Sequence, residues 1–286
     1  MQKVAGSNPI SRFIAEPVIP ISLAEATDLV GDGGRYSIQL SRAWEIWGPS
    51  GGYLAAIALR AAGRRAEIPR PASFYCHFLS SPDFDEVELA VEVLKRGRRS
   101  ESLAVKMIQR GKPVLFALVR TVADAPGYRH QELAAPEVPA PSECEPYERL
   151  VDGKPIFPFW GNVSCRRPER GANVGEKAAL IREWVRFEPE ASFEDPFVDA
   201  ARPLILLDTF GWPAVYQKHR GVDYVAPNLD TSVWFHQAAQ ASEWLLIDHG
   251  CPVAGDGLLG VSGRVWGGGG RLLASGGAQL CCMPRP

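Results

Sequence analysis

The sequence predicts an α+β fold in which one unit, a long helix wrapped by a curved antiparallel sheet, occurs twice. A helical pattern followed by four strand patterns appears at residues 48–123 and again at 203–283. The two copies are offset by about 155 residues, which indicates a duplicated domain rather than a short solenoid repeat. Only short turns separate the strands within each copy, and short connections favour antiparallel pairing.

The first helix is expected after Gly51 and Gly52, where strong helix formers follow and only Arg60 interrupts an apolar run that reaches Ala62. Ser50 is in place to cap this helix, and the two glycines permit close approach of neighbouring backbone. A helix that is apolar nearly all round must be surrounded by other structure. It is therefore expected at the centre of the first unit.

Alternation of apolar and polar residues predicts strands in both units. One or two entry strands are expected in the first 40 residues, followed by strands at 72–80, 87–94, 103–108 and 113–122. In the second unit a helix is expected at residues 199–219, with Asp199 as its cap and Pro203 near its start. The strands of the second unit are expected at residues 160–166, 180–187, 228–237, 243–249, 258–266 and 271–283.

This pattern predicts a first domain at residues 1–123 and a second domain at residues 160–286. Residues 124–159 between them are predicted to form a proline-rich linker. The prolines of this segment lie at positions 126, 136, 139, 141, 146, 155 and 158.

A motif from another fold occurs just before the first helix. Residues 48–52 read Gly-Pro-Ser-Gly-Gly, which satisfies the G-x-S-x-G pattern of an α/β-hydrolase nucleophile elbow. That fold needs several β-α units before the elbow, but only 47 residues precede Gly48. Ser50 is therefore interpreted as a helix cap or loop residue and not as a nucleophile.

The composition argues against several classes of function. Apolar residues make up 46% of the chain and charged residues 22%, as is usual for a folded globular protein. The 31 basic and 33 acidic residues leave a formal net charge of −2, which disfavours nucleic acid or an anionic membrane as a partner. No apolar run reaches the ~18 residues of a membrane span, and no secretory signal is visible. The six cysteines lack metal-ligand spacing, so reduced thiols in a cytoplasmic protein are expected.

Several segments match one known family. They are residues 51–55, 59–62, 73–79 and 94–98 in the first unit, and 229–236, 243–246 and 270–275 in the second. The most specific are Leu-Asp-x-Ser-x-x-Phe-His at 229–236 and Glu-Trp-Leu-Leu at 243–246. On these segments the sequence resembles the type II acyl-CoA thioesterases, which carry two hotdog domains in one chain. The resemblance covers roughly residues 30–123 and 160–283 and implies a double hotdog fold, with two long helices each wrapped by a curved antiparallel sheet.

The resemblance also implies hydrolysis of an acyl-CoA thioester by a water molecule that an Asp, a Ser or Thr, and a Gln orient. The Asp position falls on Asp230. The Gln position falls on Ala278, so Gln279 fills it only if Gly276 and Gly277 form a bulge that shifts the strand by one residue.

The hydroxyl position of the family falls near Cys251-Pro252, and Thr231 or Ser262 are the other groups that could approach from elsewhere. The predicted catalytic set is Asp230, Gln279 and Thr231. The expected partner is the acyl-CoA substrate, and no metal or redox cofactor is needed because the departing thiolate is a good leaving group. Hotdog sheets commonly pair, which allows a homodimer or a higher homo-oligomer.

The strand at 228–237 is the centre of this prediction. Thr231 and Val233 are expected on one face of the strand, and Ser232 and Trp234 on the other. Asp230 stands at the start of an apolar strand, where removing a carboxylate from water is costly unless it has a partner or a function. It is therefore expected beside a long apolar cavity between helix and sheet. The structural alternative for Asp230 is a strand-end carboxylate that accepts main-chain hydrogen bonds. Asp208, if buried in the second helix, needs a partner and is expected only to support the site.

Two other functions stay open. A non-catalytic acyl-CoA-binding or lipid-binding relative is suggested by the missing hydroxyl. A hydratase or dehydratase of the same fold needs a His–Asp pair that faces one pocket, and neither helical segment has a His shortly after an Asp at its N-terminal end.

Overall fold

The computed structural model describes residues 19–151, 154–168, 178–219 and 224–284. The first unit contains α1 (Leu23–Ala26), β1 (Val30–Asp32), β2 (Arg35–Gln39), η2 (Arg42–Trp44), α2 (Gly51–Arg65), β3 (Pro71–Phe78), β4 (Glu86–Arg96), β5 (Ser100–Gln109) and β6 (Lys112–Val122). Short elements follow: η3 (Pro141–Glu143), β7 (Glu145–Pro146), β8 (Leu150–Val151), β9 (Lys154–Pro155) and η4 (Pro158–Asn162). The second unit contains β10 (Val163–Arg167), β11 (Leu180–Phe187), α3 (Pro196–Thr209), α4 (Gly211–Lys218), β12 (Tyr224–Val225), β13 (Asp230–Phe235), β14 (Leu245–Gly255), β15 (Leu258–Gly267), η5 (Gly268–Gly270), β16 (Arg271–Cys281) and β17 (Met283–Pro284).

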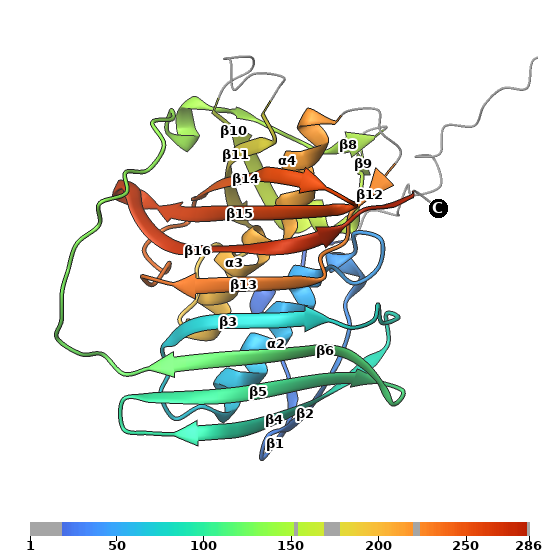
Figure 1. The fold of residues 1–286 in the computed structure, drawn as a ribbon, viewed down its shortest axis with the longest axis vertical. Coiled ribbons are helices and arrows are strands. Elements are labelled where there is room, and N and C mark those ends of the chain that lie inside the picture. The colour runs from blue at the N-terminus through green and yellow to red at the C-terminus, as the bar shows by residue number, and fades with distance from the viewer. Residues whose placement is uncertain (1–18, 152–153, 169–177, 220–223, 285–286) are drawn as a thin grey trace, which may run out of the picture.

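The two units share one 13-stranded sheet with the order β1-β2-β4-β5-β6-β3-β13-β16-β15-β14-β11-β10-β7. Counted outward from the β3–β13 junction, strands 3-6-5-4-2 of the first unit correspond to strands 13-16-15-14-11 of the second. The strand order is therefore the same in both units, which confirms the duplication predicted from the sequence. Figure 1 shows β3 and β13 side by side at the middle of the sheet.

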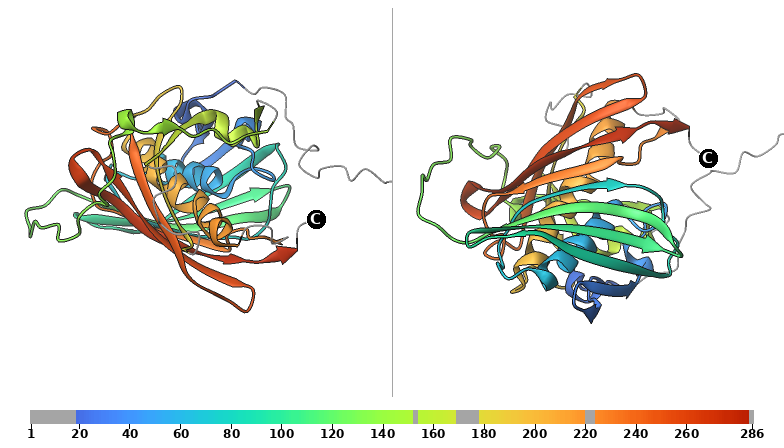
Figure 2. Two further views of the ribbon diagram at one scale, coloured as in Figure 1. Left: turned by 90° about the horizontal axis from the view of Figure 1, so that it is seen from above. Right: turned by 60° about the horizontal axis from the view of Figure 1, so that its bottom comes forward.

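The sheet curves around α2 and α3, which lie together on one of its faces (Figure 2). Ten of the fifteen residues of α2 are buried, as expected for a helix with almost no polar face. Close packing of α2 on α3 requires a glycine at position 63, because a Cβ added there would lie 2.4 Å from the ring of Phe197. The main apolar core contains residues of both units and is continuous across them.

The prediction of a single long second helix at residues 199–219 is wrong. The helix begins at Pro196 with Asp195 as its cap, and the segment is divided into α3 and α4 at Phe210. Asp195 accepts hydrogen bonds from two main-chain N–H groups of the first turn, and a proline fits that turn because its missing N–H would be unpaired there anyway. The division has a cause in Pro213, which has no N–H to donate to the carbonyl of Thr209.

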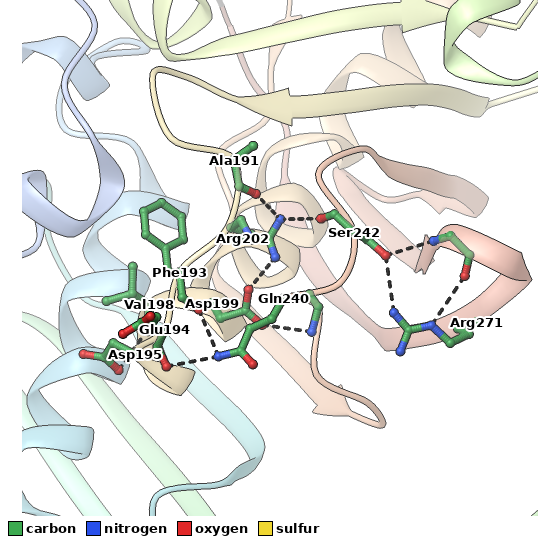
Figure 3. Close-up of polar contacts among 12 residues, drawn as sticks. Ala191, Phe193, Glu194, Asp195, Val198, Asp199, Arg202, Gln240, Ser242 and Arg271 are labelled. Atoms are coloured by element: carbon green, nitrogen blue, oxygen red, sulfur yellow. Dashed lines mark hydrogen bonds and ion pairs between the residues drawn. The ribbon is translucent and has the colours of Figure 1, made fainter.

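Asp199, which the sequence suggested as a cap, is instead part of a buried polar network (Figure 3). Its carboxylate pairs with Arg202 one turn along α3 and accepts the N–H of Ala239 at 2.9 Å. Arg202 also donates to the main-chain carbonyls of Ala191 and Ser242. The network holds the loops before α3 and after β13 against this helix.

The strands agree with the sequence pattern. β11 has the predicted bounds, and β3, β4, β5, β6, β15 and β16 deviate from them by a few residues. Within β13 the side chains of Thr231 and Val233 are buried on the helix side, while Trp234 on the opposite face is 56% exposed. The predicted assignment of faces in this strand is confirmed.

The segment predicted as a linker at residues 124–159 contains short elements of its own. β7 pairs with β10 at the edge of the large sheet, and β8 pairs with β9. Gln131 bonds the main chain of Gly270 and Leu272 through its side-chain amide. In the part of the chain that the structure describes, no helix has both the length and the hydropathy needed to cross a membrane.

Candidate active site

The carboxylate of Asp208, in the last turn of α3, is a buried acidic group. Its side chain is only 7% exposed. Thr231 donates a hydrogen bond from Oγ1 to Asp208 Oδ1 at 2.7 Å, and Asn228 donates from Nδ2 to the same oxygen at 2.7 Å. Asn228 Nδ2 also contacts the main-chain oxygen of Asp208 at 2.9 Å. The carboxylate is therefore held by β13 and by the residues just before that strand.

The N-terminus of α2 faces the same carboxylate from the first unit. A Cβ added to Gly51 would lie 2.9 Å from Asp208 Oδ2, and one added to Gly52 would lie 3.3 Å from it. The main-chain N–H of Gly52 donates to the carboxylate. A side chain at position 51 would therefore collide with the carboxylate, and one at position 52 would crowd the main chain of Ile205, whose Cα would lie 3.0 Å from the added Cβ. The positive end of the α2 dipole favours a negative charge here.

Burial dominates the protonation of Asp208. Loss of solvent raises the pKa of this carboxyl to about 6, although the hydrogen bonds from Thr231, Asn228 and Gly52 act in the opposite direction. At neutral pH the group is a partly dehydrated anion that takes up a proton more readily than an ordinary aspartate. Such a carboxylate suits general base catalysis near neutral pH.

The structure separates the three residues of the predicted catalytic set. Thr231 points to the helix side of the sheet and bonds Asp208. Asp230 is its neighbour in β13 and points to the outer side, since successive side chains of a strand alternate. Gln279 is also on the outer side, and its main-chain N–H donates to Asp230 Oδ1 at 3.0 Å. Asp230 thus makes the contact expected of a strand-end carboxylate.

The bulge that would turn Gln279 toward the helices does not form at Gly276 and Gly277. The pairing of β16 with β13 and with β15 keeps its register through both glycines. A Cβ on Gly276 would lie 2.1 Å from the carbonyl oxygen of Ser232, and one on Gly277 would lie 2.3 Å from that of Val261. These glycines therefore let three strands approach closely. Ala278, the family's Gln position, is buried on the helix side.

The other hydroxyl and thiol candidates lie elsewhere. Cys251 donates to the carbonyl of Val253, and Ser262 is exposed and paired with Gly250. Both residues line a cavity of about 390 Å³ that also contains Lys218 and Arg264. Of the predicted hydroxyl and thiol groups, Thr231 is the one that donates to a buried carboxylate, that of Asp208.

Two other polar side chains, those of His77 and Tyr75, lie near Asp230 on the outer face of the sheet. His77 is directly opposite Asp230 in the neighbouring strand, and Tyr75 Oη lies 2.5 Å from His77 Nε2. Burial and then the charge of Asp230 raise the pKa of Tyr75. His77 and Asp230 are thus cross-strand neighbours, but His77 is exposed and both residues lie on the open side of the sheet away from the helices.

Asp230 was expected beside a long apolar cavity. It is not among the residues that line either of two cavities in the described part of the chain. The first is the one that contains Cys251. The second has a volume of about 360 Å³ and is lined by Arg149, Trp160 and Cys165, among others. Trp160 packs edge-on against Phe210, two residues after Asp208, with ring centroids 5.9 Å apart.

The sequence analysis gave Asp208 only a supporting place and did not single out Asn228. The signal for Asp208 is its place at the end of the apolar run Leu204–Leu207, where a carboxylate is out of pattern. Its partners could not be read from the sequence, because Gly51 and Gly52 come from the other unit. Asn228 offered no signal of its own beyond its position before a strand.

Comparison with known proteins supports a common origin. The model of the acyl-CoA thioesterase N-terminal domain matches residues 40–123, and the model of the C-terminal domain matches residues 136–283. Acyl-coenzyme A thioesterase 8 of Homo sapiens is 26% identical and that of Mus musculus 25% identical, each over 79% of this chain and 79% of its own length.

Two solved structures share the fold. One is a conserved protein of unknown function with hot dog fold from Alicyclobacillus acidocaldarius, with a TM-score of 0.80, 23% identity and coverage of 94% of this chain and 100% of that chain. The other is the acyl-CoA thioesterase II TesB2 from Mycobacterium marinum, with a TM-score of 0.75, 22% identity and coverage of 92% and 98%. The α+β double hotdog architecture, both domain matches and the shared strand order agree, and the chain therefore belongs to the acyl-CoA thioesterase family.

Proposed function

We propose that this chain hydrolyses an acyl-CoA thioester to a free acid and CoA, and that Asp208 is the base of the reaction. The observation that carries the proposal is the Asp208 carboxylate, which is buried, has a raised pKa and lies against the N-terminus of α2. Family membership and the thioesterases named above support the substrate class.

In the proposed reaction, Asp208 accepts a proton from a water molecule as the water oxygen attacks the thioester carbon. The carbonyl oxygen becomes an oxyanion that the N-terminus of α2 stabilises, because the first N–H groups of a helix have no carbonyl partner within the helix. The tetrahedral intermediate then breaks its C–S bond. The thiolate of CoA takes up the proton from the Asp208 carboxyl, which restores the base.

Thr231 and Asn228 orient the base in this scheme. Both donate to Oδ1 of Asp208, and this leaves Oδ2 toward α2 and the incoming water. Neither Thr231 nor Asn228 transfers a proton in this scheme. Their role is to fix the carboxylate and to limit the rise of its pKa.

The test compares two carboxylates by release of free thiol from a panel of acyl-CoAs. Asp208→Asn is expected to lower kcat/KM by roughly 10²–10⁴-fold, the usual contribution of a general base. Asp230→Asn is the matched control and also tests the role predicted for Asp230 from the sequence. It is expected to retain most of the activity, because Asp230 bonds a main-chain N–H on the opposite side of the sheet.

The reverse result, loss in Asp230→Asn and activity in Asp208→Asn, would assign the base to Asp230. If the unmodified protein binds acyl-CoA but releases no thiol, hydrolysis is wrong and a binding function takes its place. Circular dichroism of each variant shows whether a loss of activity reflects a loss of fold.

A further inference from the structure

The hydroxyl of Ser50 has no assigned task in the reaction above, and its surroundings are unusual. Ser50 is the residue before α2 and is only 6% exposed. Its Oγ is buried and has no hydrogen-bond partner among the described residues. A buried hydroxyl without a partner is destabilising and calls for an explanation.

A serine at this position normally caps its helix, but Ser50 does not. The serines before α1 and η2, Ser22 and Ser41, each accept a hydrogen bond from a main-chain N–H two residues later at 3.2 Å. Ser50 has extended backbone angles suited to a cap and makes no such bond. Asp208 takes this role from the other unit, because its carboxylate accepts the N–H of Gly52. The Ser50 hydroxyl is thereby left free to donate.

The backbone holds Ser50 firmly at this place. Its N–H donates to the carbonyl of Trp44 at 3.1 Å, and its own carbonyl accepts the N–H of Leu54 at 3.1 Å. The preceding loop contains Trp47 with a φ of 110°, a backbone conformation that residues other than glycine rarely adopt. Strained backbone of this kind is often found where a functional group must be fixed.

We propose that Ser50 Oγ–H donates a hydrogen bond to the carbonyl oxygen of the bound thioester, and that the bond strengthens as this oxygen becomes an oxyanion. The inference rests on the function proposed above and adds a side-chain donor to the N-terminus of α2. Ser50 forms no covalent bond in this scheme, since water remains the nucleophile. The G-x-S-x-G segment at residues 48–52 would thus contribute a donor and not a nucleophile.

The test uses the full chain and three variants. Ser50→Ala is expected to lower kcat/KM by about 10- to 100-fold, somewhat less than the loss of a donor in an established oxyanion hole. It should leave the melting temperature unchanged or raise it slightly, because Oγ has no partner to lose and its burial without one is unfavourable. Ser50→Thr keeps a hydroxyl and should retain more activity than Ser50→Ala. Ser22→Ala removes the capping hydroxyl of α1 and should lower stability with unchanged kcat/KM.

Binding of two CoA analogues separates this role from a structural one. A trifluoromethyl ketone analogue, whose hydrate resembles the tetrahedral intermediate, should bind Ser50→Ala about 10-fold or more weakly than the unmodified protein. A thioether analogue without the carbonyl group should bind both proteins equally. Equal kcat/KM in Ser50→Ala, or an unchanged ratio of the two affinities, overturns the assignment. If the unmodified protein has no turnover, the proposed function fails and the affinity ratio still decides the role of Ser50.

Discussion

At the scale of the residue, the proposed chemistry depends on the protonation of one carboxyl group. Burial raises the pKa of Asp208 to about 6, and the base acts only when it is ionised. We therefore expect kcat/KM to fall tenfold per pH unit below about 6 and to level off above it, since kcat/KM reports the free enzyme. This fall is the acidic limb of the pH–rate profile. His249 cannot produce the acidic limb, because burial lowers the pKa of His249 to about 4.

A single variant tests whether the limb belongs to Asp208. Thr231→Val removes a hydrogen bond that lowers the pKa of this carboxyl, so the acidic limb should move to higher pH. Asp230→Asn should leave the limb in place. A limb that stays fixed in Thr231→Val would show that another group controls the rate, and pH–rate profiles of the three proteins give the answer.

The same residues show why the site could be predicted only in part. Adjacent residues of a strand face opposite ways, so Asp230 and Thr231 could not both reach one pocket from β13. The motif around Asp230 indicated the strand that holds Thr231, and the alternation of side chains placed Thr231 toward the helices. What the pattern lacked was the carboxylate that Thr231 bonds. Asp208 contacts Thr231 only because α3 packs beside β13. The two residues are 23 positions apart in the sequence.

At the scale of the element, the packing of α2 on α3 sets the position of Asp208 against Gly51 and Gly52. Gly63 is the closest point, where an added Cβ would lie 2.4 Å from the ring of Phe197. Alanine favours a helix over glycine by about 1 kcal/mol, whereas overpacking a core costs about 1–3 kcal/mol. We expect the second effect to exceed the first, so Gly63→Ala should lower the free energy of unfolding by up to about 2 kcal/mol.

A compensating change distinguishes this collision from a general defect. Phe197→Leu gives the new methyl group room, so the double variant Gly63→Ala/Phe197→Leu should be more stable than the sum of the single effects by about 1 kcal/mol. Denaturant unfolding of the four proteins measures this coupling. Strict additivity would mean that Gly63 and Phe197 do not meet as the structure shows.

The elements also mark the limits of prediction from sequence. Strands joined by tight turns were found by their period-two pattern, because each has one buried face. The second helix was predicted as one piece because residues 199–219 are apolar and helical in composition. Its division at Phe210 depends on the missing N–H of Pro213, and its start depends on Asp195 and Pro196. Pro196 and Pro213 are both visible in the sequence, but the prediction took Pro203 as the proline near the helix start and expected no division.

At the scale of the whole molecule, the two units form one structure with a shared site. Gly51 and Gly52 come from the first unit, and Asp208, Asn228 and Thr231 come from the second. Trp44 of the first unit is fully buried and packs against Phe159 and Phe187, with ring centroids 5.6 and 6.3 Å apart. The ladder between β3 and β13 joins the two halves of the sheet. Each unit therefore supplies only part of the candidate site.

This arrangement predicts one cooperative unfolding transition. Val233 is 1% exposed and pairs with Phe74 across the β3–β13 junction, whereas its neighbour Trp234 is 56% exposed on the outer face. Val233→Asp places a carboxylate in the shared core and should lower the free energy of unfolding by more than about 3 kcal/mol. Trp234→Asp, the matched control on the same strand, should change it by less than about 1 kcal/mol.

Differential scanning calorimetry tests cooperativity directly. For a chain of 286 residues that unfolds in one step, the calorimetric enthalpy should be about 200 kcal/mol near 60 °C and equal to the van't Hoff enthalpy. In Val233→Asp the whole transition should move to lower temperature, because the core on both sides of the junction is continuous. Two resolved transitions, with only one of them shifted by Val233→Asp, would show that the units fold independently and that the shared site forms only when they dock.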